Sequence, residues 1–183
     1  MDKKMRVFAA FDISNEFKIK LYNSIEDLTL KYSDINWVKP ENFHITLKFY
    51  ENIGDIQKVK DEIIDFSNNI TKIPVKFRKF SFFSHKVFYA QLKFTPFKIV
   101  KTIKNQLNTN FTPHITLARN KFGIEIKENI VESMQNIDFN HSEILDNITI
   151  YESILKKTGS EYRIIEKIYL KNSSQKSCTF CSR

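Results

Sequence analysis

Hydrophobic residues follow two different spacings along the chain. Short apolar runs, such as residues 6–13 (RVFAAFDI), are typical of buried strands. Apolar residues three or four positions apart indicate amphipathic helices. This helical spacing covers residues 17–32, after Ser14 as a suitable N-cap, and recurs over residues 56–70. The pattern therefore predicts a chain that mixes strands and helices.

The remaining elements follow from the same spacing and from turn-forming residues. Strands are predicted at 35–38, 43–50, 74–82, 86–94, 111–119, 142–153 and 162–170. A short helix is predicted up to residue 107, with Thr95 as its N-cap and Pro96 at its first position, and a weaker one at 127–134. Residues 171–183 are polar and small, which predicts a disordered tail after a single domain over residues 1–170.

The two halves of the chain are alike in kind. Each contains a strand, an amphipathic helix and a later strand that carries the tetrapeptide His-Ile-Thr-Leu, at 44–47 and again at 114–117. This order predicts two α+β lobes, each with one histidine strand. The groove between the lobes is then the expected place for both tetrapeptides.

Within each tetrapeptide a histidine and a threonine stand two residues apart. On a strand this spacing puts both side chains on one face. Two histidines can act as an acid–base pair, because a neutral ring accepts a proton from the attacking oxygen while a protonated ring donates one to the leaving oxygen. Threonine hydroxyls can donate hydrogen bonds to phosphate oxygens. The repeat thus predicts displacement at phosphorus by His44, Thr46, His114 and Thr116.

Composition narrows the picture only slightly. The 183 residues are 42% hydrophobic and include 17 Phe and 7 Tyr, which predicts a folded protein with an aromatic core. The net charge of +8 favours a phosphate-bearing partner such as nucleic acid, although a general drift towards lysine explains it equally well. No run is apolar enough for a membrane span or a signal peptide, so we expect a cytoplasmic monomer without a membrane partner.

Other chemistries find less support in the sequence. Zinc takes three or four His, Cys or carboxylate ligands, and no third ligand accompanies either tetrapeptide, so neither a metal nor a cofactor is expected. A Gly-x-Ser-x-Gly motif is absent, and the lone pair Cys178 and Cys181 has no second pair. His85 and His141 are interpreted as structural residues. A nucleotide-binding module with little turnover remains an alternative.

The tetrapeptides and their flanks resemble the 2H phosphoesterases. The shared features are the 6–12 run, Pro-Glu-Asn-Phe before the first tetrapeptide, Phe-Thr-Pro before the second, the 150–153 segment, and Gly159 and Tyr162. The likeness is greatest to the RNA 2′,3′-cyclic phosphodiesterase branch, also called 2′-5′ RNA ligase. It covers roughly residues 5–170.

This resemblance implies an α+β bilobal fold in which two antiparallel sheets line a central cleft and the helices lie outside. It also implies metal-independent hydrolysis of RNA 2′,3′-cyclic phosphate ends to 2′-phosphates, and a reversible 2′-5′ ligation in which a 5′-hydroxyl takes the place of water. By motif order His44 is the proton donor and His114 the proton acceptor, while Thr46 and Thr116 hold the phosphate. The expected substrate is such an RNA end, tRNA fragments included, or else a small cyclic nucleotide.

Arg119 and Phe8 are further candidates for the site. Arg119 matches an arginine that follows the second tetrapeptide in this family and could bind phosphate. Strict alternation turns it away from the histidine, so this role requires the strand to end or bulge near Ala118. Phe8 is a candidate for stacking on a base, although a strand Phe is more often core. Residues 105–112 are fewer than the family leads us to expect, which predicts a more open cleft there.

Overall fold

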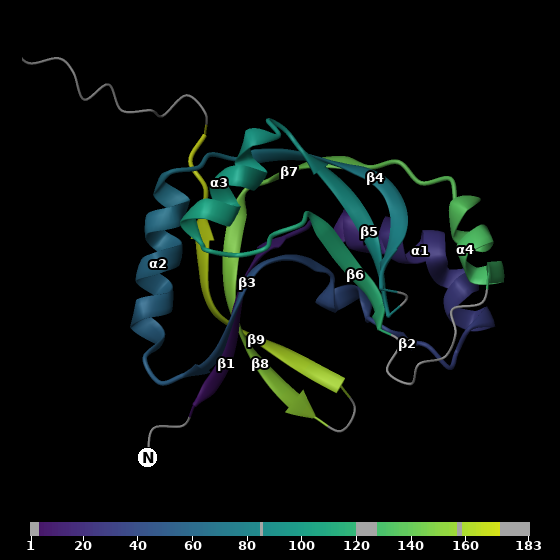
Figure 1. The fold of residues 1–183 in the computed structure, drawn as a ribbon, viewed down its shortest axis with the longest axis horizontal. Helices are drawn as coiled ribbons and strands as arrows, with labels where there is room; N and C mark the ends of the chain where they lie inside the picture. The colour runs from purple at the N-terminus through teal and green to yellow at the C-terminus, as the bar shows by residue number, and fades with distance from the viewer. Residues whose placement is uncertain (1–3, 85, 120–127, 157–158, 173–183) are drawn as a thin grey trace, which may run out of the picture.

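Two antiparallel sheets form the centre of the molecule and the helices lie around them (Figure 1). This computed structural model describes residues 4–84, 86–119, 128–156 and 159–172. The first sheet has the strand order β3 (His44–Ile53), β1 (Met5–Asp12), β8 (Asn147–Lys156), β9 (Gly159–Tyr169). The second has the order β2 (Asn36–Trp37), β6 (His114–Arg119), β5 (Val87–Phe94), β4 (Ile73–Phe83), β7 (Ser142–Leu145). The predicted α+β fold is confirmed.

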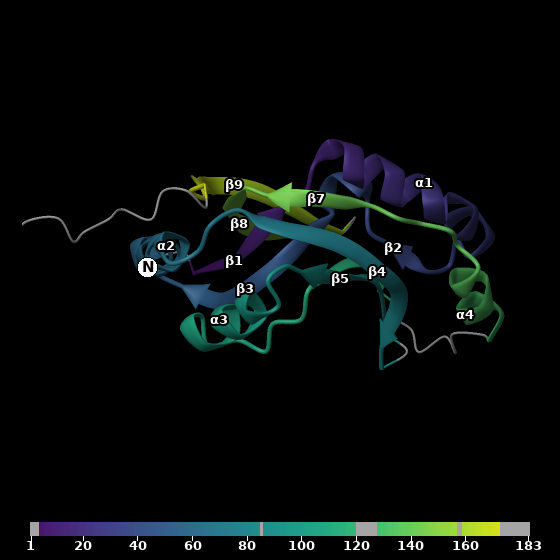
Figure 2. The ribbon, with the colours of Figure 1, turned by 90° about the horizontal axis from the view of Figure 1, so that it is seen from above.

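The helices form where the apolar spacing predicts them. They are α1 (Asn15–Lys31), α2 (Ile56–Asn68), α3 (Lys98–Gln106) and α4 (Glu128–Gln135), with a 3-10 turn η1 (Pro40–Asn42) before β3. Ser14 caps α1 as expected, because its hydroxyl accepts a hydrogen bond from the Phe17 N–H at 3.1 Å. Asp55 caps α2 in the same way. Figure 2 shows α1 on the upper side of the sheets and α3 on the lower side.

The start of α3 was predicted wrongly. The helix begins at Lys98, with Phe97 as an N-cap that lacks a side-chain hydrogen bond. Thr95, the predicted N-cap, instead extends the pairing of the β4–β5 hairpin, because its N–H donates to the carbonyl of Pro74 at 2.9 Å. Pro96 therefore lies in the turn between sheet and helix.

The single strand predicted over residues 142–153 is two strands in different sheets. β7 pairs with β4 in the second sheet, whereas β8 lies between β1 and β9 in the first. Asp146 stands between them, and its carbonyl accepts a hydrogen bond from the Leu170 N–H at 2.7 Å. The change of sheet falls at Asp146-Asn147, a pair of turn-forming residues that interrupts the apolar alternation and that the prediction of one continuous strand overlooked.

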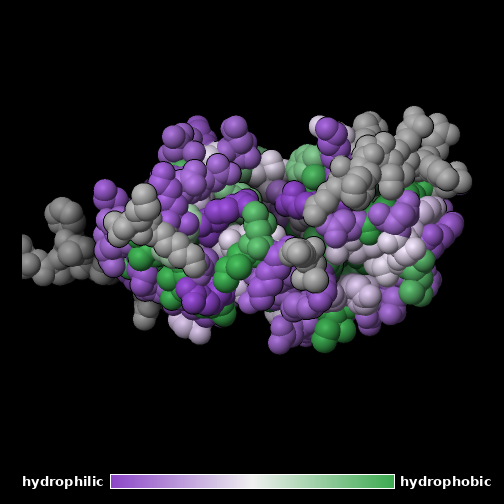
Figure 3. Space-filling model, turned by 90° about the horizontal axis from the view of Figure 1, so that it is seen from below, coloured by the Kyte–Doolittle hydropathy of each residue, from purple (hydrophilic) through white to green (hydrophobic). Residues whose placement is uncertain are grey.

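The two sheets share one hydrophobic core. Phe11 of the first sheet and Phe94 of the second are both fully buried, with ring centroids 5.9 Å apart. The α1 face formed by Phe17, Leu21, Ile25 and Leu28 packs into the same core. On the face shown in Figure 3, hydrophilic residues predominate and apolar ones form small separate patches.

Lys171, the first residue of the predicted tail, contacts the folded chain. Its carbonyl accepts from the Lys72 N–H at 3.0 Å, and its ammonium donates to Asn68 at 3.2 Å. Residues 173–183 of the predicted tail, with Cys178 and Cys181, lie outside the described residues, as do His85, residue 127 at the predicted start of the fourth helix, and Thr158. No helix in the described part of the chain has the length and apolar character needed to cross a membrane.

Two leucines on α1 test the role of this core. Leu21 is fully buried, whereas Leu30 is 74% exposed. Leu21→Ala should lower the free energy of unfolding by about 2 to 5 kcal/mol, because it leaves a cavity among packed side chains. Leu30→Ala, the matched control, should change it by less than about 0.5 kcal/mol. Urea denaturation of both variants measures this, and equal losses would contradict the described packing.

Candidate active site

The two histidine strands lie where the sheets adjoin. β3 is the edge strand of the first sheet, and β6 is separated from the edge of the second only by the two residues of β2. β3 and β6 contact each other, and the Thr109 hydroxyl, which precedes β6, donates to the Leu47 carbonyl on β3 at 3.3 Å. The fold thus brings together the two tetrapeptides, as predicted from the sequence. The more open cleft expected beside residues 105–112 stays a prediction.

Each histidine ring is fixed by the same backbone contact. The Nδ1 of His44 lies 2.7 Å from the Asn42 carbonyl oxygen, and the Nδ1 of His114 lies 2.7 Å from that of Thr112. A carbonyl oxygen only accepts, so Nδ1 carries the proton in both rings. The neutral ring then has its lone pair on Nε2. In His44 this Nε2 is 3.0 Å from the Thr46 hydroxyl.

Aromatic side chains support both rings. The ring centroid of Phe8 lies 4.8 Å from that of His44, and the ring centroid of Tyr162 lies 5.5 Å from it. Those of Phe83 and Tyr89 lie 5.1 Å and 5.4 Å from that of His114. These contacts leave each histidine ring only partly exposed.

Burial controls the protonation of both histidines. It lowers the pKa of His44 to about 4, although the hydrogen bond to Asn42 and the charge of Asp12 act in the opposite direction. Burial also lowers the pKa of His114, and the positive charge of Arg119 lowers it further. His114 in turn contributes to the low pKa of His44, so the two rings interact electrostatically. Both rings are therefore neutral at pH 7 in the free protein.

A β-bulge turns Arg119 to the face that carries His114. In the β5–β6 pair, Tyr89 opposes Thr116 but Phe88 opposes Ala118, so β6 has one extra residue. Leu117 is this extra residue, and it shifts the alternation of the residues after it by one position. Arg119 therefore shares a face of the strand with His114 and Thr116. Consistent with this, Leu117 and Ala118 are both buried whereas Arg119 is exposed. The bulge near Ala118 that a phosphate-binding role of Arg119 requires is therefore present. The contact of Arg119 with phosphate stays a prediction.

The first tetrapeptide has the same bulge. In the β1–β3 pair, Ala10 opposes Thr46 but Ala9 opposes Lys48, so Leu47 is the extra residue. Phe49 is thereby turned to the His44 face, and it is 57% exposed. Phe49 follows His44 by the same interval at which Arg119 follows the second histidine. The two copies thus present an aromatic ring in one case and a cation in the other.

Phe8 was wrongly predicted as a base-stacking residue. Its side chain is fully buried, and its ring packs against those of His44, Phe49, Tyr151 and Tyr162 at centroid distances of 4.8 to 5.4 Å. No ring face is left for a base. Phe8 is instead part of the support of His44.

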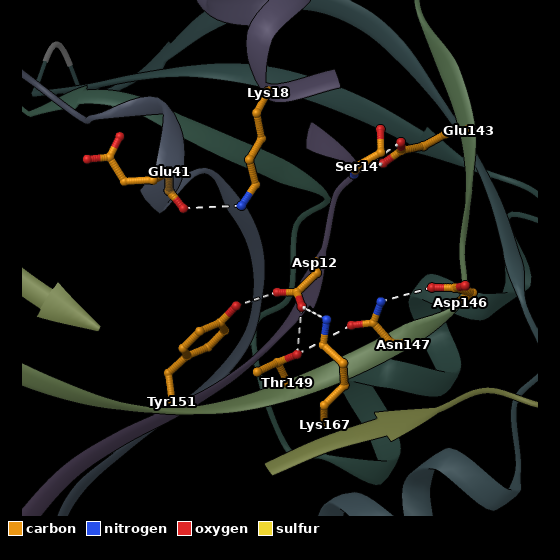
Figure 4. A network of polar contacts seen from close by, with 10 residues as sticks. All are labelled: Asp12, Ser14, Lys18, Glu41, Glu143, Asp146, Asn147, Thr149, Tyr151 and Lys167. Atoms are coloured by element: carbon orange, nitrogen blue, oxygen red, sulfur yellow. Dashed lines mark hydrogen bonds and ion pairs between the residues drawn. The ribbon is translucent and has the colours of Figure 1, made fainter. Parts of the chain in front are cut away.

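Sequence reasoning missed a polar network beside His44, which Figure 4 shows around Asp12. Asp12 is the direct cross-strand partner of His44. Its carboxylate accepts hydrogen bonds from Tyr151 (2.5 Å) and Thr149 (2.7 Å) and forms an ion pair with Lys167 (2.9 Å). Burial acts to raise the pKa of Asp12, but these contacts together lower it, so the carboxylate stays charged. The only signal in the sequence was an acidic residue at the end of an apolar strand.

A pocket of about 630 Å³ opens beside His44. It is bounded by the end of β1, the first turn of α1, η1, the β7–β8 connection and β9. Its charged lining residues are Asp12, Lys18, Glu41, Glu143, Asp146 and Lys167. Within the described ranges, no three His, Cys, Asp or Glu side chains come together in a way that could hold a metal ion.

Comparisons with known proteins agree with this geometry. Residues 11–89 match the family model of the LigT-like phosphoesterases. An RNA 2′,3′-cyclic phosphodiesterase of Thermotoga maritima is 29% identical, over 88% of this chain and 93% of that protein. One of Methanocaldococcus jannaschii is 28% identical, over 89% of this chain and 99% of that protein.

The fold has solved counterparts. The crystal structure of E. coli LigT complexed with ATP superposes with a TM-score of 0.66 at 18% sequence identity, and covers 93% of this chain and 100% of its own. The family model covers the first tetrapeptide, the relatives match most of the chain, and the resemblance to the 2H phosphoesterases is confirmed. In sequence and in fold the chain is similar to the LigT-like phosphoesterases.

Proposed function

We propose that this protein hydrolyses the 2′,3′-cyclic phosphate at an RNA end to a 2′-phosphate, with His44 and His114 as its acid–base pair. The observation that carries the proposal is the matched anchoring of the two rings. Each Nδ1 bonds to a backbone carbonyl, so Nε2 is the atom of each ring that exchanges protons with a substrate, and in His44 a substrate takes the place of the Thr46 hydroxyl at this atom. The relatives named RNA 2′,3′-cyclic phosphodiesterase support this choice of substrate.

In the proposed reaction the Nε2 of His114 accepts a proton from a water molecule as its oxygen attacks phosphorus. The bond between phosphorus and the 3′ oxygen breaks, and the Nε2 of His44 donates a proton to that oxygen. Thr46 and Thr116 donate hydrogen bonds to the non-bridging oxygens, and Arg119 balances the charge that gathers there. No step needs a metal, and ligation is the same displacement with a 5′-hydroxyl in place of water, which leaves a 2′-5′ linkage and a free 3′-hydroxyl.

The acid in this scheme must acquire its proton in the complex. His44 is neutral in the free protein because burial lowers its pKa to about 4. The negative charge of a bound phosphodiester raises the pKa of a neighbouring imidazole. Asp12 acts in the same direction from the cross-strand position. We infer that substrate binding and proton uptake by His44 are coupled, with Asp12 as a positioning residue that supports the charged ring.

Phe49 is the proposed contact for a base. It is exposed, lies on the His44 face and adjoins the aromatic cluster around Phe8. A base can stack on such a ring whatever its identity, because every base has a π-face. Phe49 therefore takes the role that the sequence suggested for Phe8.

His44→Ala and His114→Ala test the acid–base pair. Each variant should lose roughly a hundredfold or more in kcat on an RNA oligonucleotide with a 2′,3′-cyclic phosphate end, because each removes one proton-transfer group. His141→Ala is the control: its ring stacks on Phe17, with centroids 4.2 Å apart, and lies outside both tetrapeptides. Near-normal turnover by either tetrapeptide variant would refute the proposal.

The pH dependence tests the coupling of proton uptake to binding. In the proposed reaction the two histidines of the free protein must together hold one proton. The pKa values of His44 and His114 both lie below the usual 6.5. The fraction of protein that holds this proton, and with it kcat/KM, should therefore fall as pH rises above 6.5. Histidine NMR should show His44 titrating near pH 4 in the free protein and at higher pH with a bound nucleoside 2′-phosphate. Asp12→Asn should lower the pKa of His44 further. An unchanged pKa in the nucleotide complex would disprove the coupling.

A further inference from the structure

The pocket beside His44 contains a lysine with no carboxylate partner. The Lys18 ammonium donates to the Glu41 backbone carbonyl at 3.1 Å, and within the described part of the chain it forms no ion pair (Figure 4). Burial lowers the pKa of Lys18, which shows that water solvates this ammonium incompletely. Its acceptor Glu41 belongs to η1, which ends two residues before His44, so Lys18 lies on the side of the pocket near the histidine.

Most other charged groups of the pocket are paired with protein atoms. Lys167 and Asp12 form an ion pair. Both Glu143 oxygens lie 3.3 Å from the Ser14 N–H at the start of α1. Asp146 accepts from the Asn147 side-chain amide at 2.8 Å. Of the two lysines that line the pocket, Lys18 is therefore the one whose charge is not paired with a carboxylate in the described part of the chain.

The carboxylates are spread around the pocket. In Figure 4, Glu143 and Asp146 lie to one side of Asp12, and the Glu41 carboxylate points away from Lys18. An anion is repelled from the side of Glu143 and Asp146 and attracted to Lys18. An anionic ligand group therefore fits the Lys18 end, which is also the end nearest His44.

The proposed reaction sets the direction in which a substrate extends. His44 protonates the 3′ oxygen, so the ribose lies on the His44 side of phosphorus and the attacking water lies on the His114 side. The part of the substrate that continues from this ribose is its 5′ oxygen and the phosphate attached to it. The pocket beside His44 is large enough for these groups and begins at the right histidine.

We propose that this pocket is the subsite for the RNA chain that leads to the reacting end, and that Lys18 binds the phosphate on the 5′ oxygen of the terminal nucleotide. The inference rests on the proposed function, because it requires the cyclic phosphate to lie at His44. It makes Lys18 a specificity-determining residue. RNA ends and 5′-phosphorylated nucleotides carry the phosphate in question, whereas a simple nucleoside 2′,3′-cyclic phosphate does not.

Three substrates with the same base test this subsite: a nucleoside 2′,3′-cyclic phosphate, its 5′-phosphorylated form, and a dinucleotide with a cyclic end. Lys18→Met should lower the ratio of kcat/KM for the dinucleotide to that for the simple nucleoside by roughly tenfold to a hundredfold, since a charge-assisted contact is lost. If Lys18 recognises the phosphate alone, the variant should lose as much kcat/KM on the 5′-phosphorylated nucleotide as on the dinucleotide. If kcat/KM falls on the dinucleotide but not on the 5′-phosphorylated nucleotide, Lys18 recognises the phosphate only within a continuing chain.

Lys20→Met is the matched control. Lys20 lies on the same helix, pairs with Glu16 at 2.6 Å and does not line the pocket. Lys20→Met removes the same charge from the protein as Lys18→Met. It should leave the ratio of kcat/KM for the dinucleotide to that for the simple nucleoside unchanged. Lys18→Arg should retain most of the ratio. An unchanged ratio in Lys18→Met, or an equal fall in Lys20→Met, would overturn the inference.

Binding measurements separate this inference from the proposed activity. Absence of turnover with all three substrates would refute the activity. Calorimetric titration of the wild type and Lys18→Met with a nucleoside 2′-phosphate and with a dinucleotide that ends in a 2′-phosphate still decides the subsite. A selective loss of dinucleotide affinity in the variant supports it, and equal affinities of the two proteins for the dinucleotide reject it.

Discussion

The hydrogen bond from each histidine Nδ1 to a carbonyl two residues earlier is the contact on which the candidate site depends. It fixes the proton on Nδ1, orients the ring and leaves Nε2 as the reactive atom of both His44 and His114. The acceptors are held in place because η1 precedes the first strand and Pro113 precedes the second. Without this contact a partly buried imidazole would have a second unsatisfied nitrogen, and its tautomer would be undefined.

Burial gives the site its main electrostatic conflict. Rings packed against aromatic side chains favour the neutral form, whereas the proposed acid must carry a proton. Asp12 eases this conflict for His44 from the neighbouring strand, and its own charge is held by Tyr151, Thr149 and Lys167. The remaining free energy must come from the substrate anion. A site built in this way is active only when its substrate is bound, because the free protein keeps both histidines neutral.

The two tetrapeptides are equal in sequence but unequal in their surroundings. Both strands bulge directly after the threonine, and both bulges return the third residue after that threonine to the histidine face. In one strand this residue is Phe49 and in the other it is Arg119. The first strand thus presents a stacking surface and the second a positive charge, each on the face of its histidine. The pocket with Lys18 opens beside His44, and in the proposed subsite the substrate chain extends from this histidine.

The sequence by itself determined the helices, most strands and the four His and Thr residues, because apolar spacing and the repeat are local properties. Tertiary structure alone decided the rest. Strand alternation predicted the wrong face for Arg119, since a bulge depends on pairing with a neighbouring strand. Phe8 looked like a ligand contact until packing buried it. Asp12 lies beside His44 because β1 pairs with β3, and Lys18 lines the same pocket because α1 packs on η1; no spacing along the chain encodes either proximity.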